Sequence, residues 1–87
     1  MTVHAGQQTA VMAQIKAARA LLGWSQSTLA KKSRRAVATV VRAEEGRLHA
    51  DLVPSVTRSM QRALETAGVE FLNHRQPGVR LRKGLVE

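Results

Sequence analysis

The sequence predicts a small, mostly α-helical domain that ends in a β-hairpin. As far as residue 68, apolar residues recur every three or four positions between capping residues, which is typical of helices. After Gly68 the spacing changes to alternation on both sides of Pro77-Gly78, which is typical of two strands joined by a turn. With 87 residues, 44% of them apolar, the chain can form one domain with a small core.

The chain is strongly basic and poor in aromatic residues. Its 14 Lys and Arg against 6 Asp and Glu give a formal net charge of +8. Such an excess favours a polyanionic partner, because cationic side chains bind phosphates and release counterions. The alternative is charge that serves only solubility. With one Trp, one Phe and no Tyr, the chain lacks the ring faces on which single-stranded nucleic acid stacks.

Several classes of site are disfavoured. There is no Cys, and His4, His49 and His74 are scattered, so neither a metal site nor a cofactor is expected. No paired carboxylates, Ser-His-acid cluster or Gly-rich phosphate loop is present, so we do not expect an enzyme. Without a long apolar run or a signal-peptide pattern, we expect a cytoplasmic protein with no membrane partner.

The first segment is expected to be an arm followed by a helix. Residues 1–8 are polar and nearly uncharged, which is typical of a flexible arm. Thr9 can cap a helix that runs to Leu22, with Ile15 and Ala18 on its buried face. Gly23 then ends this helix from the C′ position. The helical part of the chain is expected to cover residues 9–68.

Two short helices joined by a basic turn should follow. Ser25 is a good N-cap for a helix from about Gln26 to Lys32, with Trp24 packed on its first turns. A third helix is expected from about Ala36 to Glu45, ended by Gly46. Six cationic residues lie between positions 31 and 47. The inward positions of the two helices are Leu29, Ala30, Val40 and Ala43.

A loop, a fourth helix and a hairpin complete the chain. We expect a loop over 47–53, and Pro54 suits the first turn of a helix that ends near Ala67. Its apolar positions are Val56, Met60, Ala63, Leu64 and Ala67. A hairpin over 69–83 should pair Val69–Leu72 with Val79–Arg82, followed by a tail over 84–87. Because an isolated hairpin is marginal in water, this one must pack on the helices, pair with another chain, or both.

One set of residues carries a resemblance to a known family. These residues are Ala18-Arg19, Leu22-Gly23, Ser25-Gln26, Leu29-Ala30, Val40, Glu44 and Gly46. With this spacing, residues 15–72 resemble the lambda-repressor-like (Xre-type) helix-turn-helix family. The stretches GWSQ, AGVEF and GVRLRK are similar to a subgroup of small Xre-type proteins. The resemblance implies a four- to five-helix DNA-binding domain of a bacterial or phage-type regulator.

The resemblance also implies roles for residues. The helix over 36–45 would be the recognition helix in the major groove, with Val37, Ala38 and Arg42 facing bases. Arg42 could read guanine bidentately, and Val37 and Ala38 could contact thymine methyl groups or be plain helix surface. Gln26 would also brace the recognition helix. The residues expected to contact the DNA backbone are Ser25, Gln26, Lys31, Lys32, Arg34, Arg35, Ala36, Thr39 and Arg47.

A salt bridge and two departures from the family pattern complete the implied site. Arg19 and Glu44 match a pair that links the first and third helices in the family. The turn usually carries Gly and then an apolar residue, but Arg34-Arg35 stand here, so the turn is either strained by about 1 kcal/mol or differs in geometry. Ala36 replaces the usual Ser or Thr cap of the recognition helix. The two arginines could instead form a solvated basic turn.

These features predict a sequence-specific regulator that binds double-stranded DNA as a homodimer, because one short helix reads too few base pairs. The hairpin is the first candidate for the dimer contact, and the fourth helix is the second. The hairpin residues in question are Val69, Phe71, Leu72, Val79 and Leu81. The alternative is an antitoxin or an accessory module with a protein partner; nonspecific nucleoid or RNA binding is a third option. No small-molecule ligand is expected.

Overall fold

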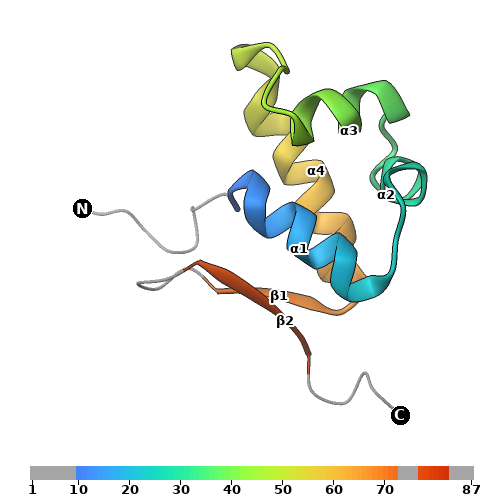
Figure 1. The fold of residues 1–87 in the computed structure, drawn as a ribbon, viewed down its shortest axis with the longest axis vertical. Coiled ribbons are helices and arrows are strands. Elements are labelled where there is room, and N and C mark those ends of the chain that lie inside the picture. The colour runs from blue at the N-terminus through green and yellow to red at the C-terminus, as the bar shows by residue number, and fades with distance from the viewer. Residues whose placement is uncertain (1–9, 73–76, 83–87) are drawn as a thin grey trace.

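The fold is mostly helical and ends in a two-stranded hairpin, as predicted (Figure 1). It was obtained as a computed structural model that describes residues 10–72 and 77–82. The predicted arm over 1–8, most of the hairpin turn and the tail over 84–87 lie outside these residues. The elements of the described part are α1 (Met12–Leu22), α2 (Gln26–Ser33), α3 (Val37–Glu44), the short 3₁₀ helix η2 (Ala50–Leu52), α4 (Val53–Thr66), β1 (Val69–Leu72) and β2 (Gly78–Leu81).

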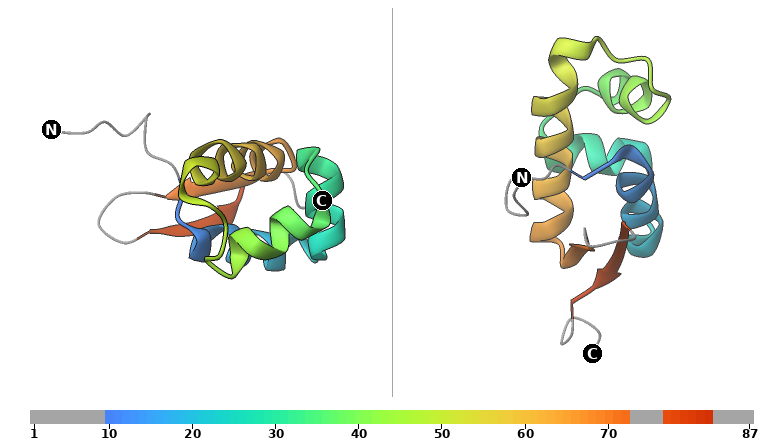
Figure 2. Two further views of the ribbon diagram at one scale, coloured as in Figure 1. Left: turned by 90° about the horizontal axis from the view of Figure 1, so that it is seen from above. Right: turned by 90° about the vertical axis from the view of Figure 1, so that its left-hand side faces the viewer.

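The helices pack around one core to which each of them contributes. Seen from above in Figure 2, α3 and α4 form opposite sides of the molecule, and α2 closes one end between them. Side chains with no exposed surface come from each of the four α-helices: Ile15, Leu29, Val40, Met60 and Leu64. All five were predicted as inward positions. Along α4, α3 lies near one end and the hairpin near the other (Figure 1).

Helix α1 begins later than predicted. Ala10 and Val11 precede the helix in non-helical conformation, so the start at Thr9, which lies outside the described residues, is wrong. The signal that was missed is Gln14, whose side-chain Oε1 accepts a hydrogen bond from the Val11 amide at 2.9 Å. A residue inside the first turn therefore caps the helix in place of a Ser or Thr before it. At the other end Gly23 has φ 69°, the predicted left-handed stop.

The segment before α4 is more ordered than the loop predicted for 47–53. It contains η2, whose first turn is closed by the His49 Nδ1, which accepts from the Asp51 amide at 3.1 Å. Pro54 lies in the first turn of α4, as expected, where its missing amide donor costs nothing. Thr57 is buried next to the predicted apolar stripe of this helix.

The hairpin packs on the helices rather than standing alone. Val69 pairs with Leu81 and Phe71 with Val79, so these four side chains share one face. Strand β2 covers Gly78–Leu81, one residue earlier than the predicted Val79–Arg82. That face packs against the helical core, with β1 on α4 and β2 on α1. On the other face Glu70 lies opposite Arg80 and accepts from its Nε at 2.6 Å.

Gln14 fastens the hairpin to α1, and nothing in the sequence pattern predicted this. The side chain is 3% exposed. Its Nε2 donates to the Leu72 carbonyl at 3.1 Å and to the Gly78 carbonyl at 3.0 Å. One buried amide thus caps α1 and holds the ends of β1 and β2, which explains how a marginal hairpin is kept in place.

Candidate nucleic-acid interface

Helices α2 and α3 form a compact two-helix unit. Ser25 caps α2 as predicted, with its Oγ accepting from the Thr28 amide at 3.1 Å. Arg34 then ends the helix with φ 60°, the only positive φ outside glycine in the described residues. Its amide donates to Lys31 O at 3.2 Å, and that of Arg35 donates to Ala30 O at 2.9 Å. The turn therefore keeps the geometry that favours Gly and is strained by about 1–2 kcal/mol.

Helix α3 begins at Val37, one residue after the predicted start, and ends at Glu44 rather than Glu45. Ala36 stands at the N-cap in extended conformation and offers no side-chain acceptor. No capping side chain therefore accepts a hydrogen bond from the first amides of α3. An anion at this end of the helix would supply the missing acceptors.

One face of α3 is uncovered. Val40, Ala43 and Glu44 are buried against the rest of the molecule. Val37 is 44% exposed, and Ala38 and Arg42 are exposed as well. Within the described residues the Arg42 side chain has no hydrogen-bond or ion-pair partner. The three residues predicted to face bases therefore all lie on this free face.

The position of α3 is held by the ion pair that the resemblance implies. The Arg19 guanidinium donates from Nε to Glu44 Oε2 and from Nη2 to Glu44 Oε1, both at 2.8 Å. Gln26 Nε2 donates to the same Oε1 at 2.9 Å. The expected contact between Gln26 and the third helix is thus present, and a phosphate contact from Gln26 stays a prediction. Glu44 ties α1, α2 and α3 together at one point.

The cationic residues predicted to contact the DNA backbone are placed in three ways. Lys31 and Lys32 are exposed on the last turn of α2, and the Lys32 Nζ lies 5.8 Å from the centroid of the Trp24 ring. Arg47 is exposed and pairs with Glu45 at 3.0 Å. Arg34 is exposed but faces a cleft shared with α4. These cations therefore spread beyond the α3 face.

The Arg35 side chain bonds helix α4. Its Nε and Nη2 donate to Ser59 Oγ at 3.2 and 2.8 Å, and Nη2 also donates to Ser55 O at 3.4 Å. The half-buried guanidinium thus ties the turn to α4. The contact of Arg35 with a DNA backbone stays a prediction.

The remaining backbone-contact residues lie near the start of the two helices. Ser25 and Ala36 are exposed N-caps, and Thr39 is half-buried in the first turn of α3. The Ser25 hydroxyl lies 3.1 Å from that of Thr28. Ser25 is therefore used within α2, although its exposed position leaves room for an outside acceptor.

Most of the hairpin residues predicted to make a dimer contact pack against the core of their own protomer. Val69 is 1% exposed and belongs to the core. Phe71, Val79 and Leu81 are half-buried and pack against that core, and Leu72 is half-buried. Contact with a second chain could therefore use the backbone edges of the hairpin, whereas its apolar face is already covered.

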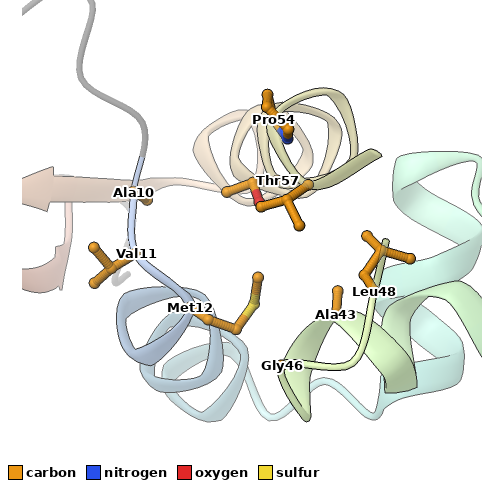
Figure 3. Close-up of a pocket in the computed structure, with 9 residues that line it drawn as sticks. Ala10, Val11, Met12, Ala43, Gly46, Leu48, Pro54 and Thr57 are labelled. Carbon is orange, nitrogen blue, oxygen red and sulfur yellow. The ribbon is translucent and has the colours of Figure 1, made fainter. Parts of the chain in front are cut away.

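An apolar hollow of about 450 Å³ lies between the start of α1, the end of α3 and the start of α4 (Figure 3). Met12, Leu48 and Thr57 point toward it from three separate segments. The lining residues Val11 and Val53 are exposed, and Leu52, which precedes Val53 in the chain, is 49% exposed. The lining residues are Ala10, Val11, Met12, Ala43, Gly46, Leu48, Val53, Pro54 and Thr57. The sequence did not point to this surface, because it joins three distant segments.

The described residues were also considered as a metal site and as a membrane span, and they form neither. No group of three His, Cys, Asp or Glu that could hold a metal ion occurs among them. None of the helices in this part of the chain is long and apolar enough to cross a membrane. In comparisons with known proteins, no protein-family model matches the chain, and no curated protein matches it either.

Proposed function

We propose that the protein is a cytoplasmic, Xre-type helix-turn-helix regulator that binds double-stranded DNA sequence-specifically as a homodimer. The observation that carries the proposal is the uncovered face of α3, on which Val37, Ala38 and the Arg42 side chain are exposed while Glu44 holds the opposite face in place. A rigid helix with a free, mixed apolar and cationic face suits insertion into a groove.

The dimensions and chemistry of that face fit the major groove. The groove is about 12 Å wide and admits an α-helix of about 10–12 Å in diameter. Arg42 can donate two hydrogen bonds to guanine O6 and N7, and Val37 and Ala38 can contact thymine methyl groups. Lys31 is exposed on the neighbouring helix, within the same two-helix unit, and can bind flanking phosphates.

A second copy is needed because one short helix contacts too few base pairs to select a site in a genome. Of the two predicted dimer surfaces, the one at the start of α4 is favoured because it is apolar and exposed. The hollow there is lined by uncharged residues, among them the exposed Val53, and Leu52, which precedes Val53 in the chain, is exposed as well. Two chains that each carry +8 repel one another, so an uncharged apolar contact favours their approach. The hairpin face lacks this advantage because it already covers its own core.

Selection from random duplexes, followed by footprinting and a binding isotherm, tests the proposal. We expect one enriched, two-fold symmetric site that binds on the order of 10³-fold or more tightly than a shuffled duplex of equal length and salt. Equal affinity for both duplexes would mean nonspecific binding. Failure to bind any duplex at low salt would reject DNA as the partner.

The apolar hollow also favours a second function, that of an antitoxin or accessory module whose partner is another protein. The same exposed Val11, Leu52 and Val53 could receive a foreign chain instead of a second copy. Light scattering during size exclusion distinguishes these: a chain that is monomeric at tens of micromolar, both free and on DNA, supports the protein-partner alternative over the homodimer.

A further inference from the structure

A second basic site lies away from the uncovered face of α3. It is a cleft of about 400 Å³ between the end of α2 and the middle and end of α4. Its lining residues are Lys32, Ser33, Arg34, Ser59, Arg62, Ala63 and Thr66. None of them belongs to α3, which packs near the opposite end of α4 from the hairpin (Figure 1). The cleft is therefore separate from the uncovered face of α3.

Three cations share the cleft without an acidic neighbour in its lining. Lys32 and Arg34 come from α2 and its C-cap, and Arg62 faces them from α4. None of the three forms an ion pair within the described residues. The acid nearest to Arg62 in sequence, Glu65, does not line the cleft and accepts from Gln61 at 3.1 Å. Like charges that line one cleft repel one another unless something compensates them.

The backbone at Arg34 adds a second, independent cost. With φ 60° it occupies the left-handed region, where a residue with a side chain is strained and glycine is not. The negative end of the α2 dipole favours a cation at Lys32. That dipole does not account for Arg62 on another helix, nor for an arginine at the one position of the turn that suits glycine. Strain of this kind is typical of functional positions.

We propose that this cleft binds a phosphate group, with Lys32, Arg34 and Arg62 around the oxyanion and the Thr66 hydroxyl as a further donor. Two guanidinium forks and one ammonium match the geometry of phosphate oxygens. Ser59 and Ser33 are already committed, since Ser59 Oγ bonds Ser55 O and the Arg35 guanidinium, and Ser33 Oγ donates to Leu29 O at 2.7 Å. The Arg35 guanidinium behind Ser59 adds positive charge at the wall of the cleft.

The phosphate could belong to a free compound or to a nucleic-acid backbone, and two arms of one experiment separate these sources. In the first arm, inorganic pyrophosphate is titrated into ¹⁵N-labelled protein, with sodium chloride at equal ionic strength as the reference. We expect saturable shifts at Arg34, Arg62 and Thr66, weakened at least tenfold by Arg62→Gln and by Arg34→Gly. Arg58→Gln is the matched control, because Arg58 is an exposed α4 cation outside the cleft, and binding should be unchanged.

In the second arm, the same variants are measured on a duplex. If a phosphodiester fills the cleft, Arg62→Gln lowers the slope of log K against log salt by about 1, and pyrophosphate competes. If Arg62→Gln abolishes pyrophosphate binding but leaves duplex binding unchanged, the ligand is a free phosphate compound. Both results support the site. Equal, weak shifts at all exposed cations, or tighter binding of polyglutamate than of pyrophosphate, would overturn it. The first arm needs no DNA, so it stands or fails separately from the proposed function.

Discussion

The Arg19 guanidinium grips the Glu44 carboxylate with two parallel hydrogen bonds of 2.8 Å, one to each oxygen. Its remaining nitrogen, Nη1, donates to the Trp24 carbonyl at 3.1 Å. The Glu44 side chain is 3% exposed and that of Arg19 is 22% exposed. Since Gln26 also donates to Glu44, the buried carboxylate accepts three hydrogen bonds and both of its oxygens are bonded. Helix α1, the start of α2 and α3 are thus linked through one side chain.

Removing that carboxylate should loosen the whole two-helix unit. We expect Glu44→Ala to lower the free energy of unfolding by about 3 kcal/mol, the low end for breaking a buried pair, because Arg19 keeps some solvent access. DNA affinity should fall as well, since α3 loses its brace. Urea unfolding and a binding isotherm measure both. Glu45→Ala is the control: it removes an exposed pair with Arg47 and should cost under about 1 kcal/mol. Unchanged stability in Glu44→Ala would contradict the role of the pair.

Gln14 should control the hairpin without touching the α3 face. Gln14→Ala removes two donors from carbonyls at the ends of β1 and β2 and uncaps α1, so we expect a loss of about 1–3 kcal/mol. Amide hydrogen exchange in the hairpin should accelerate more than in α4. Gln61→Ala is the control, because Gln61 Oε1 accepts from the Ala10 amide and Gln61 bonds none of the described hairpin residues. Equal acceleration in both variants would argue against a specific link.

Much of the fold could be predicted because it depends on local signals. Gly23, Ser25 and Pro54 act through backbone geometry within one or two turns, and their predicted roles are present in the structure. The pairing of Val69 with Leu81 follows from alternation around a turn. The predicted start of α1 was wrong because Gln14, which caps the helix from inside its first turn, is not marked by any periodic pattern in the sequence. Its partners, Leu72 and Gly78, are distant in sequence, and single-sequence periodicity does not report such contacts.

The candidate site divides along the same line. The free face of α3 follows from helical spacing, so Val37, Ala38 and Arg42 could be placed from the sequence. The sequence did not show which cations face solvent and which contact α4. Lys31, Arg34 and Arg35 are near neighbours in sequence, yet their side chains lie in different surroundings. Arg35 turns onto α4 and Arg34 onto the cleft with Arg62. Only tertiary packing of α4 against α2 decides these directions.

The base-reading role of Arg42 predicts a loss that depends on sequence. Arg42→Ala should cost about 1–3 kcal/mol on the selected duplex and relax the preference at one base pair. Lys31→Ala should instead weaken all duplexes alike and lower the salt slope by about 1, as expected for a phosphate contact. Competition binding with a set of single-base variants measures both effects. An equal loss on selected and shuffled duplexes would reject base reading by Arg42.

The apolar hollow at the start of α4 predicts where a substitution should disrupt the dimer. A charge at this exposed apolar position would be buried without a partner in a dimer contact, so we expect Leu52→Asp to be monomeric at a concentration where the unmodified chain is dimeric. Leu21→Asp is matched in chemistry and exposure but lies on α1 outside the hollow, and it should remain dimeric. Light scattering during size exclusion gives the masses. A dimer that survives Leu52→Asp and dissociates when the β2 edge is blocked would return the contact to the hairpin.

The strain at Arg34 predicts a substitution that stabilises the fold. Glycine removes the clash of a side chain at φ 60°, worth about 1–2 kcal/mol, and loses part of this through the greater freedom of the unfolded chain. We expect Arg34→Gly to raise the free energy of unfolding by about 0.5–1 kcal/mol. Arg34→Ala removes the same charge but keeps the strain, so it isolates the backbone effect from relief of repulsion with Lys32 and Arg62. Urea unfolding of the two variants side by side gives the difference. If glycine is no more stable than alanine here, the turn is not strained, and the conformational cost assigned to Arg34 disappears.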